Sequence, residues 1–412
     1  MSTAPAPPLA LIATVTAIGF SALHVVVPVL PVIAAAFAAP PEAAQWVLTL
    51  YFIGIAAGQL FYGPVSDRFG RRPVLLAGLA AFLAGTALCG FAWSLPVLAG
   101  ARIVQALGGC AGLVLGRAII RDVCEREAAT RAIALVMMAM TLAPAVCPAV
   151  GAYLSEWFGW RAIFAVLGGL GAAALALTAC RLAETNRGGA ALDLVGMARA
   201  YALLLRSRTF AMFALCSACS SASWFVFIAS APYLLAERLG EPPSTYGLMI
   251  LIPMAAYMLG NAAAARLGRR LGSTALFVAG LVVSLASGAL MAAWCAAGLS
   301  VWALFVPMAA SSIGNGLSQP AALAAGLSVY PRLAGTASGL IGFLQMAVSA
   351  LGTVALGMLP RDAFATVAVV GLAQIGALAL GLGALAPRRE AGTAGRQNAL
   401  RRGRFLARRR RA

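Results

Sequence analysis

The chain has 412 residues, of which 62% are hydrophobic and 10% charged, and its formal net charge at pH 7 is +18. A mean hydropathy of +0.92 excludes an ordinary soluble domain, because apolar stretches of about 20 residues match a bilayer core roughly 30 Å thick. We therefore expect the bilayer to be the main solvent of this protein.

Hydrophobic segments long enough to cross a bilayer recur along the chain when it is read in windows of about 19 residues. Six precede a polar stretch, at 9–33, 44–65, 73–93, 95–120, 131–155 and 161–181. Six follow it, at 209–233, 245–265, 273–295, 300–328, 334–358 and 363–386. Their glycines and prolines do not argue against helix, because neighbouring helices in a bundle satisfy the freed backbone groups. The pattern predicts an all-α integral membrane protein with twelve transmembrane helices.

The segments divide the chain into two halves of six helices. The expected boundaries are an N-terminal half at 1–181, a cytoplasmic linker at 182–208, a C-terminal half at 209–386 and an Arg-rich cytoplasmic tail at 387–412. The sequence Asp67-Arg-Phe-Gly-Arg-Arg72 is echoed by Ala265-Arg-Leu-Gly-Arg-Arg270 at about half the chain length. Two pseudo-symmetric halves place a cavity between them near the bilayer midplane, which is suited to alternating access.

The charge pattern orients the bundle. Every basic side chain other than the single histidine is Arg, and the arginines cluster at alternating helix junctions, such as Arg68 to Arg72 and Arg266 to Arg270. Because cytoplasmic loops carry the excess of basic residues, both termini are expected in the cytoplasm. The bias toward Arg, Ala and Gly fits a GC-rich bacterial genome, so we expect a multi-pass protein of the bacterial inner membrane.

Ten of the arginines lie in the last 25 residues, from Arg388 to Arg411. A basic run beside a membrane attracts anionic lipid by about 1 kcal/mol per charge. Lipid contact or a topological signal is therefore expected of this tail. Nucleic-acid binding is the alternative, and we expect no nucleic-acid partner.

Metal and enzyme chemistry find little support in the sequence. The eight cysteines are scattered, and the close pair Cys216 and Cys219 has no second Cys or His pair nearby, so we expect packing and no metal or redox site. We see no paired carboxylates and no nucleophile with an evident base, so the chain is not expected to be an enzyme.

One polar stretch carries a family resemblance. The pattern Gly63-x-x-x-Asp67-Arg68-x-Gly70-Arg71-Arg72 resembles the signature loop of the major facilitator superfamily. The surrounding sequence over about 28–165, including Gly58-Gln-Leu60 and Gly159-Trp-Arg161, resembles that of the Bcr/CflA (bicyclomycin and chloramphenicol resistance) exporters. This resemblance implies a proton-coupled secondary transporter that exports small amphipathic drugs, amphenicol- or bicyclomycin-like, by alternating access. A facilitator or importer of a small metabolite on the same fold is the alternative.

The signature stretch has a physical rationale as a conformational latch. Gly63 and Gly70 allow a tight turn and close helix approach, and a carboxylate flanked by arginines forms ion pairs that depend on the conformational state. A purely topogenic loop would explain the arginines but neither Asp67 nor the two glycines.

The resemblance also implies partners for this latch. It implies that Asp67 meets the N-terminal end of the eleventh predicted helix, at 334–358, where the helix dipole favours an anion. It further implies that Arg71 pairs with Asp122 at the end of helix four, while Arg68 and Arg72 face lipid headgroups or solvent. The expected latch residues are Gly63, Asp67, Arg68, Gly70, Arg71 and Asp122.

The fourth predicted helix, at 95–120, carries Arg102 within the membrane. A charge at such a depth normally faces a cavity or a partner. The resemblance implies a role in proton handling, with Gln105 and Gly108 on the same face. Alternatively, Arg102 is a static strut that bonds backbone carbonyls of helix one. Arg117, nearer the cytoplasmic end, is expected to reach the interface or to brace the latch.

Helix five contains Pro144, Pro148 and Gly151 in a segment that resembles the antiporter signature of proton-driven exporters. Cys147 and Ala152 stand where the general form has glycines. The prolines predict a bendable helix and Gly151 a close contact, with ordinary kinked packing as the alternative.

Helix one carries His24, which aligns with a family position that usually holds an aspartate. No Asp or Glu falls deep inside a predicted span. A histidine, with an ordinary pKa near ~6.5, is therefore the candidate proton carrier. The alternative is a neutral histidine that orients substrate or bonds a neighbouring Ser or Thr. Proton coupling is thus assigned to His24 and Arg102.

Aromatic, methionine and amide side chains at helical spacing suggest the lining of a substrate cavity, although the same side chains pack helices in any bundle. The candidates are Met138, Trp224, Phe227, Tyr257, Asn315, Gln319 and Gln345. The lack of a buried acid argues against cationic substrates and leaves neutral molecules, or anions drawn to Arg102. Expected partners are a small-molecule substrate, protons and the lipid bilayer, for a monomer without cofactors that uses the proton gradient as its energy source.

Overall fold

The computed structural model describes residues 9–123, 126–186, 193–359 and 362–386, which form helices without strands. The first part of the chain contains α1 (Leu9–His24), η1 (Val27–Val29), α2 (Leu30–Ala36), α3 (Pro41–Phe69), α4 (Arg71–Gly90), α5 (Leu95–Val123), α6 (Arg126–Phe158) and α7 (Arg161–Arg181). The second contains α8 (Leu194–Arg206), α9 (Arg208–Tyr233), η2 (Leu234–Arg238), α10 (Pro243–Met249), α11 (Leu251–Leu271), α12 (Ser273–Ala297), α13 (Val301–Ser328), η3 (Pro331–Leu333), α14 (Ala334–Gly357) and α15 (Ala363–Leu385). The Arg-rich tail predicted at 387–412 and the side chain of Met138 lie outside the described part.

Ten helical segments in the described ranges are long and apolar enough to cross a membrane. The remaining two expected spans are α6, with 33 residues, and α13, with 28 residues. Helix α13 is also long enough to span, but Ser311, Ser312 and Asn315 lower its hydropathy. The all-helical membrane fold predicted from the hydrophobic segments is therefore confirmed.

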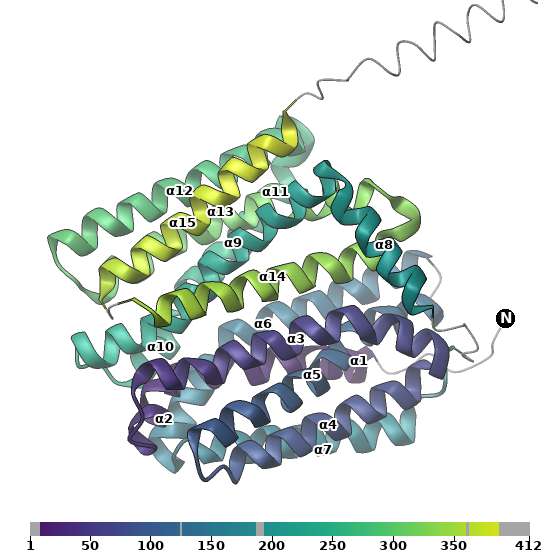
Figure 1. Ribbon diagram of the computed structural model, residues 1–412, viewed down its shortest axis with the longest axis horizontal. Coiled ribbons are helices and arrows are strands. Elements are labelled where there is room, and N and C mark those ends of the chain that lie inside the picture. Colours follow the sequence, from purple (N-terminus) through teal and green to yellow (C-terminus); the bar gives the residue numbers. More distant parts are fainter. Residues whose placement is uncertain (1–8, 124–125, 187–192, 360–361, 387–412) are drawn as a thin grey trace, which may run out of the picture.

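The long helices form two groups (Figure 1). Helices α1 and α3 to α7 pack with one another, and α9 with α11 to α15 pack with one another. Contacts between the groups are made chiefly by α3 with α14. The short helix α10, which precedes α11 in the second group, adds a contact with α6. The seam between the groups is where a cavity can form.

Glycines let matching helix pairs cross closely in both groups. A Cβ atom on Gly108 of α5 would lie 2.6 Å from the carbonyl oxygen of Gly78 in α4. A Cβ atom on Gly314 of α13 would likewise meet the carbonyl oxygen of Gly280 in α12. Because any side chain at these positions would push the helices apart, each crossing depends on glycine. The internal repeat therefore extends to packing as well as sequence.

Two helix breaks also correspond between the groups. Gly70, with φ of 95°, separates α3 from α4, and Gly272, with φ of 81°, separates α11 from α12. Glycine adopts this left-handed region without steric cost, whereas other residues do so rarely. The sequence echo had instead aligned Gly70 with Gly268, which lies inside α11, so the structural correspondence is displaced by about one helical turn.

Helix α3 extends farther than its hydrophobic pattern indicated. The apolar segment was expected to end at 65, but the helix continues to Phe69 and includes Ser66, Asp67 and Arg68. Polar side chains at a membrane surface are compatible with helix, and only the backbone of Gly70 ends it. The predicted polar hinge is therefore mostly a helix end.

The linker contains the amphipathic helix α8, which was predicted only as a polar stretch. Asp193 caps its first turn by accepting a hydrogen bond from the Gly196 backbone. Leu204 is fully buried, and the Tyr201 hydroxyl donates to the Leu60 carbonyl at 3.0 Å. The linker is thus attached to the end of α3.

We call the end of the bundle that holds Gly70, Gly272 and α8 the basic end, because Arg68, Arg71, Arg72, Arg266 and Arg270 lie there. The other end, which holds α2 and α10, is called the opposite end (Figure 1).

Candidate functional site

A cavity of about 700 Å³ lies between the two helix groups. Its walls come from α1, α3, α5 and α6 on one side and from α9, α11, α13 and α14 on the other. It reaches toward the basic end, where Leu323 and Ser338 contribute to its lining. A volume of this size accommodates a drug-sized molecule.

Most of the predicted cavity residues do line this space. They are Trp224, Tyr257, Asn315, Gln319 and Gln345, and Pro144 of the proposed antiporter segment joins them. Phe227 does not: its side chain is fully buried and its ring packs edge-on against Phe305 at 5.5 Å. Three residues along a helix rotate the side chain by about 60° from the starting face, which turns Phe227 away from the cavity that Trp224 lines.

The amides of Gln319 and Gln345 are joined through Ser217 of α9, which the sequence analysis did not single out. The Ser217 hydroxyl donates to Gln319 Oε1 at 2.6 Å and accepts from Gln345 Nε2 at 2.9 Å. Gln319 Nε2 also donates to the Ser217 carbonyl at 3.2 Å. Each residue is held by another helix, so this wall presents a fixed and uncharged polar surface.

His24 lines the cavity near the kink that follows α1. Its Nδ1 lies 2.8 Å from the Phe20 carbonyl oxygen, which can only accept, so Nδ1 carries the proton. Nε2 is then an acceptor, and it is buried without a hydrogen-bond partner. The ring lies between those of Phe20 and Phe225, at 6.1 and 6.5 Å. The geometry leaves one nitrogen available for a proton or for a substrate donor.

Arg102 is fully buried among α1, α3 and α5 and does not line the cavity. Its Nη1 donates to the Ala22 carbonyl at 3.0 Å and to Gln105 Oε1 at 2.6 Å. Its guanidinium lies over the Tyr51 ring, with the carbon 3.9 Å from the ring centroid. The bond to α1 has the geometry expected of the strut, and the proton role assigned to Arg102 stays a prediction.

Arg117, by contrast, does line the cavity. It was expected to reach the interface or to brace the latch. Its side chain is half-buried, six residues before the end of α5 at Val123, on the same face as Leu113. The arginine that faces the cavity is therefore Arg117 rather than Arg102.

Helix α6 closely approaches the turn that follows α1, at Gly151. A Cβ atom there would overlap the Val25 carbonyl oxygen. Pro148, buried in the same helix, lies next to α10, because its carbonyl oxygen is close to Gly247. The close contact expected of Gly151 is therefore present, while its part in antiport stays a prediction.

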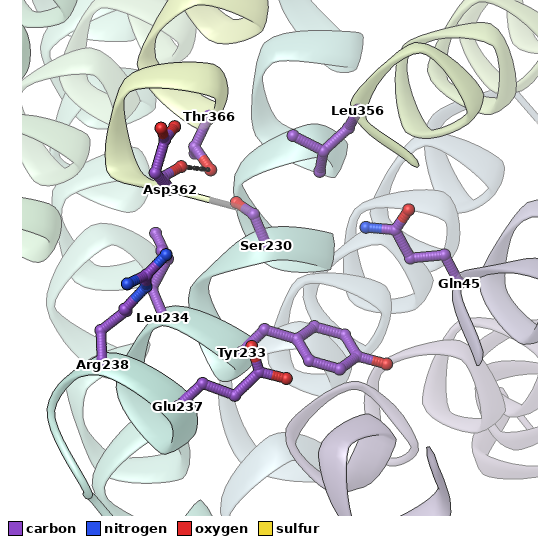
Figure 2. Close-up of a pocket in the computed structure, with 9 residues that line it drawn as sticks. All are labelled: Gln45, Ser230, Tyr233, Leu234, Glu237, Arg238, Leu356, Asp362 and Thr366. Carbon is purple, nitrogen blue, oxygen red and sulfur yellow. Dashed lines mark hydrogen bonds between the residues drawn. The ribbon is translucent and has the colours of Figure 1, made fainter. Parts of the chain in front are cut away.

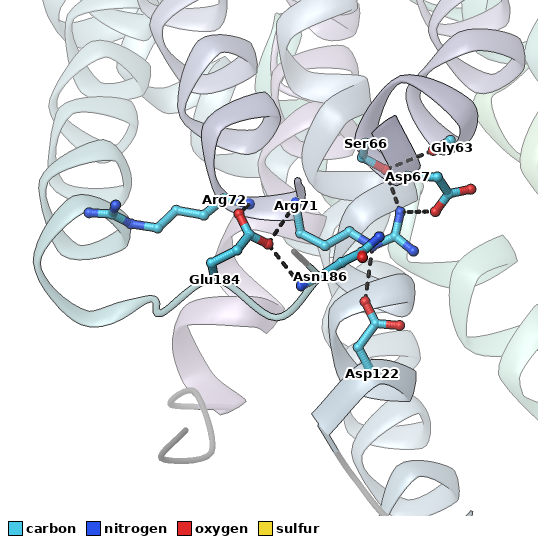
Figure 3. Close-up of polar contacts among 8 residues, drawn as sticks. All are labelled: Gly63, Ser66, Asp67, Arg71, Arg72, Asp122, Glu184 and Asn186. Atoms are coloured by element: carbon cyan, nitrogen blue, oxygen red, sulfur yellow. Dashed lines mark hydrogen bonds and ion pairs between the residues drawn. The ribbon is translucent and has the colours of Figure 1, made fainter. Parts of the chain in front are cut away.

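The polar network at the basic end centres on Arg71 (Figure 3). Arg71 Nε donates to Asp122 Oδ2 at 3.0 Å, and its Nη1 pairs with Asp67 and also donates to the Ser66 hydroxyl. The Arg71 side chain is 10% exposed, against 26% for Asp122 and 49% for Asp67. The implied contact of Arg71 with Asp122 is present, whereas the ion-pair partner of Asp67 in this conformation is Arg71 and not a helix end.

Glu184, which sequence reasoning missed, completes this network. It lies just after α7 and accepts from the backbone amides of Arg71 at 2.9 Å and Arg72 at 3.1 Å, in the first turn of α4 (Figure 3). A Cβ atom on Gly70 would lie 2.6 Å from Glu184 Oε2. A carboxylate at a helix N-terminus is favoured by the free amides and by the helix dipole.

Of the remaining latch expectations, the one for Gly63 is corrected. Arg72 is partly exposed, as the resemblance implied, but its Nη2 also donates to the Ala179 carbonyl of α7 at 2.8 Å. Gly63 makes no close helix approach, since a Cβ atom there would meet nothing within 4 Å. Arg68 lies over the neighbouring Phe69 ring at 5.3 Å and takes no part in the network.

The two groups also touch at the opposite end. The hydroxyls of Thr49 in α3 and Thr353 in α14 lie 2.9 Å apart, and both are buried. The Ser244 backbone amide of α10 donates to Glu156 Oε1 of α6 at 2.8 Å. These bonds hold the seam shut beyond the deep end of the cavity.

A small pocket lies beside this seam (Figure 2). It is lined by residues of α3, α9, η2, α14 and α15, including Gln45, Glu237 and Asp362. Gln45 Oε1 is buried without a hydrogen-bond partner. Within the described ranges, no cluster of three His, Cys, Asp or Glu residues has the arrangement of a metal site.

Comparison with known proteins identifies the family. The family model described as Major Facilitator Superfamily matches residues 9–353 and 213–411. The chloramphenicol resistance protein of Pseudomonas aeruginosa is 36% identical over 224 residues, which cover 54% of this chain and 52% of the relative. The chain thus spans about half the length of that relative.

Two further relatives match over longer stretches. The bicyclomycin resistance protein homolog of Haemophilus influenzae is 27% identical over 76% of this chain and 79% of its own. Multidrug resistance protein D of Escherichia coli is 29% identical over 69% of this chain and 71% of its own. These names agree with the Bcr/CflA resemblance.

Solved structures agree on the fold. A bacterial homolog of the human lysosomal transporter Spinster superposes with a TM-score of 0.72 at 18% identity, covering 91% of this chain and 96% of that one. A D-xylose-proton symporter superposes with a TM-score of 0.70 at 17% identity, covering 91% and 95%. The helix arrangement, the cavity at the seam and the family match together show that this chain is a membrane transporter of the major facilitator superfamily.

Proposed function

We propose that this transporter exports small amphipathic drugs in exchange for protons, by alternating access of the cavity to the two sides of a bacterial inner membrane. The observation that carries the proposal is the cavity of about 700 Å³, lined by aromatic rings and amides and by His24. Such a lining suits a neutral amphenicol- or bicyclomycin-like molecule. The names of the relatives from Pseudomonas aeruginosa and Haemophilus influenzae support this substrate class.

The proposed motion is a rocking of residues 1–181 against 209–386, with 182–208 as the cytoplasmic linker. The hydrogen bond between Thr49 and Thr353 stabilises one state at the opposite end. The network of Arg71, Asp67 and Asp122 is the proposed latch at the basic end, and in this conformation its ion pairs join α3, α4 and α5 within the first half. The basic end is assigned to the cytoplasm by the positive-inside rule, and the chain acts as a monomer without a cofactor.

His24 is the proposed proton carrier. Its Nδ1–H is bound to the Phe20 carbonyl, while Nε2 is buried and unpartnered in a residue that lines the cavity. Protonation at Nε2 creates a cation that must be hydrated or paired. Loading and release of the proton are therefore coupled to the side of the membrane from which water enters the cavity.

The test is accumulation of labelled chloramphenicol in energised inside-out vesicles, with and without an uncoupler of the proton gradient. Accumulation that the uncoupler abolishes is the expected result. Uptake that only equilibrates, or that ignores the uncoupler, would contradict proton-driven export and indicate a facilitator.

The His24→Gln variant tests the carrier in the same vesicles. It is expected to bind chloramphenicol but not to accumulate it against a gradient. Tyr257→Phe, which changes another cavity residue without altering a titratable imidazole, is the matched control and is expected to stay uncoupler-sensitive. Unchanged pH-dependent transport by His24→Gln would remove the proton role.

A further inference from the structure

The charge on the cavity wall is unbalanced. Of the described residues that line the cavity, Arg117 carries a full positive charge and no Asp or Glu is present. No hydrogen bond or ion pair to a described residue joins the Arg117 guanidinium, which contrasts with Arg102 and Arg71. A cationic side chain within a membrane protein normally faces a partner or an aqueous path, and here it faces the space assigned to substrate.

From this placement we propose that the cavity also takes amphipathic organic acids, whose carboxylate or comparable anionic group binds the Arg117 guanidinium. The inference rests on the proposed function, since it treats the cavity as the substrate site. A planar guanidinium presents donors in a fork that matches a carboxylate in two parallel hydrogen bonds. The substrate range is thereby extended from neutral drugs to anions.

The position of Arg117 suits this role. It lies six residues from the end of α5 at Val123, or about 9 Å along the helix. Trp224 lies sixteen residues into α9 from the same end, or about 24 Å along it. An acid group is therefore held near the mouth at the basic end, while the apolar part of the molecule extends inward toward Tyr257 and Met254.

The opposite wall provides hydrogen bonds but no competing charge. Gln319 and Gln345 are fixed through Ser217, and Asn315 and Asn261 line the same space. Amides bind neutral and anionic polar groups alike, so discrimination by charge falls to Arg117. Neutral drugs are accepted without using this arginine.

The test uses two probes of nearly the same size and apolar surface that differ in charge, 1-naphthylacetate and 1-naphthylacetamide. Their binding to the full-length protein in phosphatidylcholine nanodiscs is measured by titration calorimetry without a proton gradient. Naphthylacetate is expected to bind at least tenfold more tightly than the amide. Arg117→Gln is expected to weaken naphthylacetate binding at least tenfold and amide binding less than twofold.

Arg121→Gln is the matched control, because it removes an arginine one turn along the same helix that does not line the cavity. It is expected to leave both affinities within twofold. Arg117→Lys, which keeps the charge but loses the fork, is expected to retain part of the preference. Equal binding of both probes to the unmodified protein, or equal losses in the Arg117 and Arg121 variants, would overturn the proposal.

Chloramphenicol accumulation in vesicles, measured in parallel, separates this inference from the proposed function. If both naphthyl probes bind equally well while chloramphenicol still accumulates in an uncoupler-sensitive way, only the anion site is overturned. Charge-selective binding without any accumulation supports the anion site and contradicts the proposed export.

Discussion

The hydroxyls of Thr49 and Thr353, 304 residues apart in sequence, form a buried hydrogen bond of 2.9 Å between the two helix groups. Thr353 also donates to the Ala350 carbonyl at 2.8 Å, so Thr49 is the donor between the groups. This bond closes the seam at the opposite end, and any state that opens there must break it.

Replacing either threonine by valine is expected to destabilise the closed seam. A single Thr353→Val change leaves the Thr49 hydroxyl buried without its acceptor, which costs about 1–3 kcal/mol. The double change to valine removes both hydroxyls and leaves neither buried without a partner. Its loss of stability is therefore expected to be smaller than that of the more destabilising single variant. Hydrogen exchange of the ends of α3 and α14 measures this, and additive effects would contradict the pairing.

Asp122→Asn is expected to weaken the proposed latch and lower transport while leaving membrane insertion intact. The side chain is 26% exposed, so loss of its charge costs about 1 kcal/mol, which shifts an equilibrium between two states by roughly fivefold. Asp67→Asn is expected to act in the same direction but less strongly, because its side chain is 49% exposed. Chloramphenicol transport per inserted molecule is the measurement. Arg68→Gln, outside the network, is the control, and an equal loss there would indicate a general charge effect.

Glu184→Ala is expected to loosen the first turn of α4. Two backbone amides, those of Arg71 and Arg72, lose their acceptor, and loss of a helix cap costs about 0.5–2 kcal/mol. Amide exchange in 71–75 is expected to accelerate several-fold. Glu184→Gln retains one acceptor oxygen and is expected to fall between the alanine variant and the unmodified protein; equal exchange in all three would remove the capping role.

Attachment of the linker helix to α3 is expected to be insensitive to pH until strongly alkaline conditions. Burial raises the pKa of the Tyr201 phenol, whose hydroxyl donates to the Leu60 carbonyl. A raised pKa in the folded state means that the contribution to stability is full below the ordinary value of about 10 and declines as the pH rises above it. Tyr201→Phe is expected to abolish this alkaline decline in the protection of α8 amides, and an unchanged decline would assign it to another group.

The sequence predicted the helices well because the length and hydropathy of a span are properties of the local chain. The sequence did not predict features that depend on the packing of neighbouring helices, such as the direction in which an arginine points. Arg102 and Arg117 lie fifteen residues apart on α5, which turns them about 60° from one another. Hydropathy gives the depth of each arginine but not whether it faces the Ala22 carbonyl or the cavity.

The latch region shows the same limit. The family pattern pairs Arg71 with Asp122, whereas Glu184 lies 113 residues from Arg71 and belongs to no recognisable sequence motif. The polar character of Ser66 to Arg68 indicated a loop, although the helix continues until the positive φ of Gly70. Backbone geometry of this kind is not visible in composition.

The close crossing of Gly78 and Gly108 has a mechanical consequence. It fastens α4 to α5 without intervening side chains, so the two helices turn as one stiff lever. Arg117 and Asp122 are on one arm of that lever, five residues apart, and Arg71 begins the other. Under the proposals above, a molecule bound to Arg117 contacts the same rigid helix pair that carries both partners of the Arg71–Asp122 ion pair. That ion pair then braces α4 against α5, and substrate binding is transmitted to both helices together.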